Sequence, residues 1–312
     1  MRWLDHQKSV SDALRGAVIA LGNFDGFHKG HQAVAGEAIE WAHQEGRPSI
    51  IATFDPHPVR FFRPDVPPFR LTTLEQRQEL YLAAGATAMM VFQFDKDLAS
   101  TSAEDFITEI LINRFGADGV VTGGDFTFGQ GAKGNVALLK EYGAEQGLQS
   151  RVVDVVEEGQ EVISSSRIRE ALRDGDPQLA ADLLTRPFAI RGIVEHGDKN
   201  GRKLGYPTAN VAIDKYLRPK YGVYAVTGKV LSTGETLKGA ANIGIRPQFE
   251  PPKELLEPHF FDFSGDLYGQ EIEVAFHHFL RGEAKFESLD DLITQMDKDC
   301  AEARRLLSAA PQ

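Results

Sequence analysis

Cysteine is almost absent from this sequence, in which Cys300 stands alone among 312 residues. A single thiol excludes an intramolecular disulfide and a zinc site built on several cysteines, and it favours a reducing compartment. No run of about 18 apolar residues occurs, and Arg2, Asp5 and Lys8 interrupt the N-terminus, so neither a membrane span nor a signal peptide is predicted. We therefore expect a cytoplasmic protein that does not bind membranes.

Positive charge is also in short supply, with 34 Lys and Arg against 45 Asp and Glu and a net charge of −11. The chain thus lacks the broad positive field of proteins that bind nucleic acid non-specifically, and no nucleic-acid partner is expected. No G-x-x-x-x-G-K-[ST] P-loop occurs, so phosphate must be bound by other means. The length favours two domains, and 42% hydrophobic with 25% charged residues is typical of globular proteins.

The first half alternates short β-rich runs with longer segments of helical period. This pattern is typical of βα units around a parallel sheet. Thr73 with Gln76 and Ser102 with Asp105 have the spacing of capping boxes at helix starts. We predict a doubly wound, Rossmann-like α/β domain whose strands lie at residues 17–21, 49–54, 87–94, 119–123 and 150–156.

The second half has a different pattern, which begins where Arg186-Pro187 interrupts a helical segment. Beyond it, β-rich runs follow one another with glycine and proline turns and no helices between them, which predicts an antiparallel β-barrel. Ser288 opens a last amphipathic helix, which we expect to pack against the barrel. The predicted domains are residues 1–186 and 187–312, and the barrel strands lie at residues 188–196, 222–230, 237–244, 255–263 and 271–280.

A glycine-rich turn between a strand and a helix is the main functional pattern of the first half. Residues 22–31 read G-N-F-D-G-F-H-K-G-H and directly follow the strand at 17–21. Free backbone N–H groups and the positive end of the helix dipole bind phosphate at such turns. A lone histidine here would be read as a surface residue, but His28 and His31 together add two side-chain donors. They match the H-x-G-H signature of nucleotidyltransferases, in which such donors stabilise the charge on phosphate oxygens.

Other residues of the first half suit a nucleotide and a flat ring. Ser164, Ser165 and Ser166 at a helix start, with Arg169 close behind, form a second anion-binding end, and a triphosphate is expected between it and the histidines. Several aromatic side chains are suited to wall a flat apolar ring, although each alone is as well explained by core packing. They are Phe61, Phe62, Phe126 and Phe128.

The barrel half carries a second phosphate pattern at residues 196–210, H-G-D-K-N-G-R-K-L-G-Y-P-T-A-N. Its glycines allow backbone N–H groups to approach phosphate, although a turn-rich linker is the plainer interpretation. Thr208 and Asn210 lie two residues apart on an extended segment and so face the same way, where they can share one Mg²⁺ ion. Glu257, taken alone, reads as a solvent-facing residue of an alternating strand.

Taken together, these motifs resemble those of prokaryotic bifunctional riboflavin kinase/FAD synthetases over nearly the whole chain. The motifs of the first half are residues 22–31, T-F-D-P-H-P (53–58), G-D-F-T-F-G (124–129) and I-S-S-S-R-I-R (163–169). Those of the second half are P-T-A-N (207–210), P-K-Y-G-V-Y-A-V (219–226), A-N-I-G-I-R-P-Q-F (241–249), L-L-E-P-H-F-F-D-F (255–263), D-L-Y-G (266–269) and L-R-G-E-A-K-F (280–286).

The resemblance implies two activities with Mg²⁺ as cofactor and ATP, riboflavin and FMN as the small-molecule substrates. The barrel would phosphorylate riboflavin to FMN, and the α/β domain would join FMN to AMP, releasing pyrophosphate and FAD. In the adenylyltransferase, His28 and His31 would be catalytic, and ATP would contact Gly22, Phe24, Asp25, His28, Gly30, His31, Ser164, Ser165 and Arg169. Flavin would contact Pro56, Pro58, Phe62, Asp125 and Phe128.

For the kinase, the resemblance makes Glu257 the catalytic base and Thr208 and Asn210 the metal ligands. ATP would contact Gly197, Gly201, Lys203, Gly205, Pro207, Thr208 and Asn210, and flavin would contact Asn242, Glu257 and Arg281. The chain departs from the family pattern at Gln248, where threonine is usual, and at Pro258, where a β-branched or small residue is more usual. We expect altered kinetics or flavin contacts from these changes, with activity retained, and an edge or bulge at Pro258 because proline lacks an N–H.

Three other functions are compatible with parts of the sequence. Gly129, Gly131 and Gly134 match G-x-G-x-x-G, with Asp154 twenty residues on, as in an NAD-dependent oxidoreductase. However, D-F-T-F separates these glycines from their strand, and Asp154 is expected inside a strand. A nucleotidyltransferase acting on pantetheine phosphate or a lipid alcohol phosphate leaves the barrel unexplained. A flavin-binding regulatory protein would not need the residues assigned to group transfer, which are His28, His31, Thr208, Asn210 and Glu257. No protein partner is implied.

Overall fold

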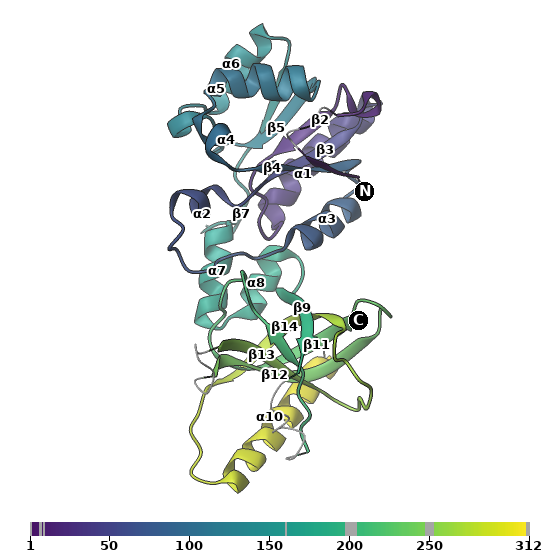
Figure 1. Ribbon diagram of the computed structural model, residues 1–312, viewed down its shortest axis with the longest axis vertical. Coiled ribbons are helices and arrows are strands. Elements are labelled where there is room, and N and C mark those ends of the chain that lie inside the picture. Colours follow the sequence, from purple (N-terminus) through teal and green to yellow (C-terminus); the bar gives the residue numbers. More distant parts are fainter. Residues whose placement is uncertain are drawn as a thin grey trace. The chain divides into compact units, whose positions relative to one another are not determined.

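The computed structural model describes residues 2–5, 8, 10–159, 161–196, 205–246 and 253–309. Contacts along the chain divide it into two compact units, Met1–Pro67 with Thr73–Ser164 and Pro68–Thr72 with Ser165–Gln312 (Figure 1). Within the described residues, no helix is long and apolar enough to cross a membrane.

The first unit is built on a six-stranded parallel sheet in the order β1-β4-β3-β2-β5-β6 (Figure 1). All neighbouring strands run parallel, and the predicted runs form five of them, while β1 is an edge strand that the sequence pattern did not predict. The central strand β2 is buried along its whole length and β3 along all but its last residue, because both faces of the sheet are covered. The strands are β1 (Arg2–Asp5), β2 (Val18–Leu21), β3 (Ser49–Asp55), β4 (Ala88–Gln93), β5 (Gly119–Gly123) and β6 (Gln149–Val153).

Two core layers pack against this sheet. Helices α1 (Lys29–Gln44) and α3 (Leu74–Ala83) cover one face, with Trp41 and Tyr81 fully buried in it. The π-helical η2 (Phe106–Arg114) and α6 (Val136–Glu145) contribute to the core of the other face. The shorter elements are η1 (Asp12–Leu14), α2 (Pro58–Phe62), α4 (Lys96–Ser100), α5 (Ala103–Asp105), η3 (Gln130–Ala132), β7 (Glu157–Glu158) and β8 (Glu161–Val162).

The loop with the G-x-G-x-x-G spacing does not form a dinucleotide-binding turn. Phe128 and Gly134 exchange backbone hydrogen bonds across it, and α6 begins only at Val136, far from the end of β5. A Cβ on Gly129 would lie 2.7 Å from the backbone of Ala103, so close packing requires glycine there. The expectation that Asp154 lies inside a strand was wrong, because β6 ends one residue before it.

The second unit is a closed antiparallel barrel in the order β10-β13-β12-β11-β14-β9. Helix α10 (Leu289–Ala309) packs on β11, β12 and β14 through a small cluster that includes Ala225, Ala240, Ala303 and Leu307 (Figure 1). The predicted fold class, a Rossmann-like sheet followed by a barrel and a terminal helix, is confirmed. The strands are β9 (Ala189–Glu195), β10 (Asn210–Ala212), β11 (Gly222–Val230), β12 (Thr236–Arg246), β13 (Lys253–Phe260) and β14 (Glu271–Gly282).

Helices α7 (Ser165–Asp174) and α8 (Pro177–Leu184) belong to the barrel unit by their contacts. Helix α8 packs on β14, and the backbone N–H of Lys220 donates to the carbonyl of Leu172 at 2.9 Å. The division by contacts therefore falls between Ser164 and Ser165, whereas the boundary predicted at residue 186 would assign both helices to the first domain.

Candidate active sites

Three predicted segments meet at one edge of the parallel sheet. Adjacent strands β3, β2 and β5 end together, and they are followed by residues 56–62, 22–31 and 124–128. The chain proceeds from β2 outward to β3 and β4, then returns to the other side of β2 with β5, so β2 and β5 flank a topological switch point. Ligands of open α/β sheets bind at this point because the loops on its two sides diverge.

The histidine turn, residues 22–31, places two imidazoles at the start of α1. His28 is the N-cap residue, and its Nδ1 accepts a long hydrogen bond of 3.4 Å from the backbone N–H of His31. An accepting Nδ1 carries no proton, so the neutral ring bears its proton on Nε2 and presents a donor there. The two rings stack with centroids 3.6 Å apart, and His28 is buried while His31 is half-buried.

The glycines and phenylalanines of the turn fix these rings. A Cβ on Gly30 would lie 3.2 Å from Cε1 of His28, so a larger residue there would push the imidazole by a few tenths of an ångström. Phe24 and Phe27 both have a φ of +46°, which is costly for a bulky side chain. The ring of Phe24 meets His31 edge-on at 5.2 Å. The backbone is therefore strained at both residues, and one of the two rings packs against the histidine pair.

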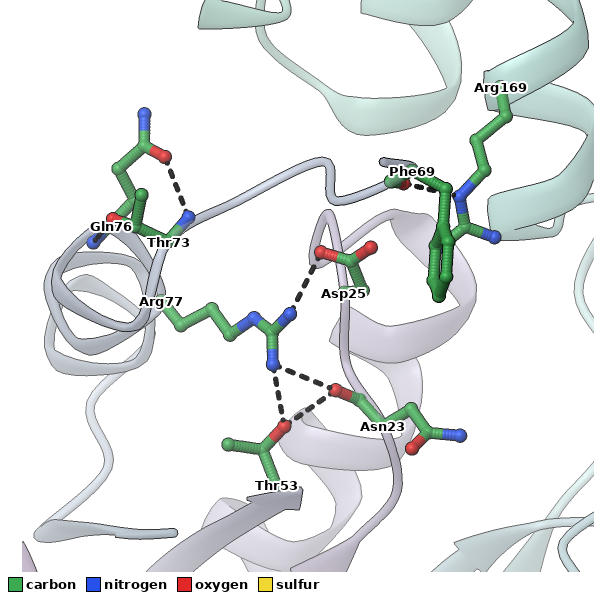
Figure 2. A network of polar contacts seen from close by, with 8 residues as sticks. All are labelled: Asn23, Asp25, Thr53, Phe69, Thr73, Gln76, Arg77 and Arg169. Atoms are coloured by element: carbon green, nitrogen blue, oxygen red, sulfur yellow. Dashed lines mark hydrogen bonds and ion pairs between the residues drawn. The ribbon is translucent and has the colours of Figure 1, made fainter. Parts of the chain in front are cut away.

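Beneath the turn lies a buried ion pair that the sequence analysis did not predict. Arg77 on α3 donates from Nη2 to Oδ1 of Asp25 at 2.9 Å, and both side chains are only 2% exposed (Figure 2). Nη1 of Arg77 also donates to Oγ1 of Thr53 at 3.0 Å and to the carbonyl of Asn23 at 3.4 Å. Asp25, predicted to contact ATP, is thus held inside the loop.

The turn also has a buried acceptor for which the described part of the chain offers no hydrogen-bond partner. Oδ1 of Asn23 is buried and has no hydrogen-bond partner among the described residues. A buried polar atom of this kind usually meets a ligand or water.

The segment that ends at Ser164 lies beside the histidine turn. The carbonyl of Ile163 is 3.5 Å from the position that a Cβ on Gly30 would take.

Aromatic side chains gather past the ends of β3, β4 and β5. Phe62 is 63% exposed and meets Phe61 and Phe94 edge-on at 5.1 and 5.7 Å. Phe126 and Phe128 stack at 5.8 Å, and Phe128 is buried. The predicted flavin residues Pro56 and Pro58 precede Phe62 in the same loop and α2, and Asp125 is exposed directly after β5.

Ser165 and Arg169 lie in the second unit, on helix α7. Ser165 is the first residue of the helix, and Arg169 lies one turn further on. Nε of Arg169 donates to the carbonyl of Phe69 at 2.9 Å, and its guanidinium lies 5.0 Å from the Phe69 ring centroid (Figure 2). The predicted pairing of these two residues with the histidines stays a prediction.

The barrel brings the predicted kinase residues into a single row across its strands. Glu257 on β13 is directly opposite Asn242 on β12, and the register of β10 with β13 places Asn210 on the other side of Glu257. Asn242 is in turn opposite Val223, which is opposite Arg281 on β14. We call these five residues the outer row. The next residues along three of the strands, Val211, Ile243 and Leu256, are fully buried inside the barrel, and side chains alternate between the two faces of a strand.

The P-T-A-N segment is attached to β13 and α10. The N–H of Ala209 donates to the carbonyl of Pro258 at 2.9 Å, and the carbonyl of Pro207 lies 2.9 Å from Nδ1 of His259. Tyr206 donates its hydroxyl to the carboxylate of Asp297. This hydrogen bond, with a smaller effect of burial, raises the pKa of Tyr206 to about 12. Helix α10 therefore contacts the chain directly before Thr208.

Pro258 lies on β13 just beyond the residues that pair with β10. A residue's N–H and C=O point to the same side of a strand, and the carbonyl of Pro258 points toward Ala209. The missing N–H would face the carbonyl of Ala209, just outside β10, whose pairs with β13 are Val211 with Leu256 and Ala212 with Leu255. Pro258 pairs with Ala241 on β12 without a register shift, so it lies at a local edge and not at a bulge.

Arg281, predicted to contact flavin, is held by α10. Its Nε and Nη2 donate to Asp299 at 2.9 and 2.7 Å, and Nε2 of Gln295 donates to the same carboxylate at 2.9 Å. Gly205, Pro207 and Thr208 are described and lie at the start of this site. The predicted contacts Gly197, Gly201 and Lys203, and the departure Gln248, lie outside the described residues.

Sequence reasoning missed the residues that support each site. Arg77 and Asp297 lie in segments without a recognisable motif, and Tyr206 lies inside the 196–210 pattern without a role assigned to it. Their partners are distant in the chain. A buried arginine gives no periodic signal, because a charge on a helix is read as solvent-facing.

Comparisons with known proteins cover both units. A family model for FAD synthetase matches residues 10–167, and one for riboflavin kinase matches residues 184–307. The bifunctional riboflavin kinase/FMN adenylyltransferase of Escherichia coli K12 is 39% identical over 290 residues, which cover 93% of this chain and 92% of that protein. The protein of the same description from Bacillus subtilis 168 is 38% identical and covers 94% of this chain and 93% of its own.

A solved structure agrees with the whole architecture. A crystal structure described as a macrolide-efflux protein from Streptococcus pneumoniae has a TM-score of 0.86 and 30% identity, covering 97% of this chain and 98% of that one. The two family models follow one another along this chain, and the relatives above, described as bifunctional, are 38% and 39% identical over more than nine tenths of it. On these grounds the chain belongs to the family of bifunctional riboflavin kinase/FMN adenylyltransferases.

Proposed function

We propose that this protein makes FMN and then FAD. The barrel transfers the γ-phosphoryl group of ATP to riboflavin, and the α/β domain transfers AMP from a second ATP to FMN. The observation that carries the proposal is that the His28–His31 pair and the row around Glu257 lie in separate compact units, and one of the two family models matches each. We assign the functional domains to residues 1–186 and 187–312, and the protein to the cytoplasm, where its single cysteine stays reduced.

In the adenylyl transfer, an FMN phosphate oxygen attacks the α-phosphorus of ATP and the bond to pyrophosphate breaks. The attacking phosphate is already ionised, so no base is needed. His28 donates from Nε2, and His31 donates beside it, to the phosphate oxygens on which negative charge accumulates. The N-terminus of α1 adds its free N–H groups to the same anion. Ser164, Ser165 and Arg169 are proposed to hold the far phosphates.

In the kinase reaction, the terminal hydroxyl of the riboflavin side chain attacks the γ-phosphorus of ATP, and the bond to ADP breaks. Glu257 accepts the hydroxyl proton as the new O–P bond forms. Asn242, directly opposite Glu257, is proposed to orient the flavin. Asn210, on the other side of Glu257, places the phosphate-binding segment next to the base.

Mg²⁺ is proposed as the cofactor of both steps, and Thr208 and Asn210 fit it. Their hydroxyl and amide oxygens are hard ligands that Mg²⁺ prefers. Among the described residues, no cluster of three or more His, Cys, Asp or Glu side chains is arranged to hold a metal. This fits an ion that enters with the nucleotide and uses few protein ligands. When bound, Mg²⁺ neutralises charge on the triphosphate.

A chromatographic time course of the protein with riboflavin, ATP and Mg²⁺ tests the proposal. We expect FMN to appear first and FAD to follow, with ADP and pyrophosphate released in the corresponding amounts. If FMN accumulates alone, the adenylyltransferase assignment is wrong. If only supplied FMN is converted, the kinase assignment is wrong.

The hydrogen bond between Tyr206 and Asp297 predicts a specific effect on the kinase. Tyr206→Phe should raise the KM for ATP about fivefold in FMN formation, which corresponds to the ~1 kcal/mol typical of one hydrogen bond. The phenol pKa is raised above its usual value of 10. The hydrogen bond is therefore fully present below pH 10 and is lost only as the pH rises through about 12, so the defect should be constant across neutral pH.

FAD formation from supplied FMN serves as the control for Tyr206→Phe. Phenylalanine keeps the edge-on ring contact with His259 at 5.3 Å, so packing is retained. An unchanged KM for ATP would show that α10 does not position the P-T-A-N segment.

A further inference from the structure

We propose that Arg77 is a positioning residue for adenylyl transfer, whose guanidinium holds the histidine turn in its working conformation. The inference rests on the proposed function of that turn. Arg77 is only 2% exposed, so it acts through other residues and not on the substrate itself.

The guanidinium ties three separate segments together. Arg77 lies on α3, Asn23 and Asp25 lie on the histidine turn, and Thr53 lies near the end of β3 (Figure 2). Thr53 closes the network by donating its hydroxyl to the carbonyl of Asn23 at 2.6 Å. The planar fork of arginine satisfies a carboxylate, a hydroxyl and a carbonyl at the same time. The turn is thereby fixed to two elements of the sheet domain.

Helix α3 is itself well anchored at the end that carries Arg77. Thr73 accepts from the N–H of Gln76 at 3.2 Å, and the side chain of Gln76 accepts from the N–H of Thr73 at 2.9 Å (Figure 2). This reciprocal capping box fixes the first turn of the helix. Arg77 therefore projects from a rigid support.

A chain of contacts leads from Arg77 to the catalytic rings. Its two partners on the turn, Asn23 and Asp25, flank Phe24, whose backbone has a positive φ of 46°. Bulky residues persist in this conformation only where their surroundings hold them there. The ring of Phe24 lies edge-on to His31, which stacks on His28. Release of the turn at Asn23 and Asp25 would let Phe24 relax and shift both imidazoles.

The energetics favour positioning over plain stability. Burying an arginine and an aspartate costs desolvation that their attraction offsets only in part, and apolar residues of similar volume often stabilise a fold as well or better. What an apolar pair does not supply is directional contact to a backbone carbonyl and a hydroxyl. The network is thus better suited to fixing a loop geometry than to adding stability.

Kinetics of FAD formation from supplied FMN test the inference with Arg77→Met and Arg77→Lys. We expect Arg77→Met to lower kcat about 100-fold, as a displacement of about 1 Å at a reacting centre does, with a much smaller change in the KM for ATP. Arg77→Lys keeps a positive charge beside Asp25 but lacks the planar, forked guanidinium. Its kcat should be about tenfold higher than that of Arg77→Met and still about tenfold below the wild-type value. FMN formation by the barrel should be unchanged.

Leu14→Ala is the matched control for a merely structural effect. Leu14 is buried in the same unit. It precedes β2, so it lies at the N-terminal ends of the strands, whereas the histidine turn follows their C-terminal ends. Thermal unfolding of each variant gives the fraction of folded α/β domain at the assay temperature. The rate of FAD formation is divided by this fraction. Leu14→Ala should lower the unfolding temperature and leave kcat unchanged.

Two results would overturn the positioning role. One is a kcat per folded molecule of Arg77→Met that equals the wild-type value, as for Leu14→Ala. The other is a wild-type kcat in Arg77→Lys. This second result also tests the positioning role if Arg77→Met does not fold. A wild-type protein that makes no FAD from FMN would instead refute the proposed function itself, so the two failures are distinguishable.

Discussion

His28→Ala is expected to lower FAD formation about 100- to 1,000-fold and to leave FMN formation intact. The alanine variant loses the Nε2 donor that the N-cap geometry orients, and it also loses the stacking partner of His31. A preorganised donor of this kind acts where charge develops in the transition state, so the loss should be in kcat more than in KM. Separate chromatographic assays with riboflavin and with FMN measure the two activities.

The N-cap role of His28 requires its own control. Removing a capping side chain destabilises a helix by about 1 kcal/mol, whatever the catalytic role. His28→Asn keeps a good capping acceptor while lacking the imidazole donor, so it should regain the stability of the wild type without regaining FAD formation. Recovery of FAD formation in His28→Asn would show that the imidazole itself is not required, because the amide of asparagine still offers an N–H donor. Loss of both activities in folded His28→Ala would contradict the two-site proposal.

Glu257→Ala is expected to have the opposite effect, with FMN formation reduced about 100- to 10,000-fold and FAD formation from supplied FMN unchanged. Glu257 is the one carboxylate of the outer row, between Asn210 and Asn242. Its removal leaves no neighbour in that row able to accept the proton of the riboflavin hydroxyl. Single-turnover FMN formation at saturating riboflavin and ATP measures the chemical step directly.

Two further variants separate base catalysis from packing in the barrel. Glu257→Gln keeps the size and hydrogen-bonding capacity of the side chain but is not a base, so it should be as inactive as Glu257→Ala. Glu271→Gln changes an exposed carboxylate at the start of β14 in the same barrel and should have no effect. Substantial FMN formation by Glu257→Gln would show that Glu257 binds the flavin without accepting its proton.

Much of the architecture was predictable because it is encoded by neighbours in the chain. Apolar runs of strand length, a capping box at Thr73 and a proline at 187 act over a few residues, and the structure has the strands and helices that they predict. The histidine turn is a local pattern of the same kind, since a strand, glycines and a helix start follow one another within residues 17–31. The short β10 and the edge strand β1 were missed because three or four residues carry too little periodicity.

Tertiary structure decided what supports each site. Arg77 reaches Asp25 across 52 residues, and Tyr206 reaches Asp297 across 91. The outer row depends on strand register, since a slip of one residue would turn Glu257 into the barrel. The sequence by itself determined the two-part architecture and the motifs, because these depend on short-range periodicity and turn chemistry. Packing alone decided that α7 and α8 join the barrel and that a buried arginine lies under the histidine turn, because such contacts depend on distant segments folding together.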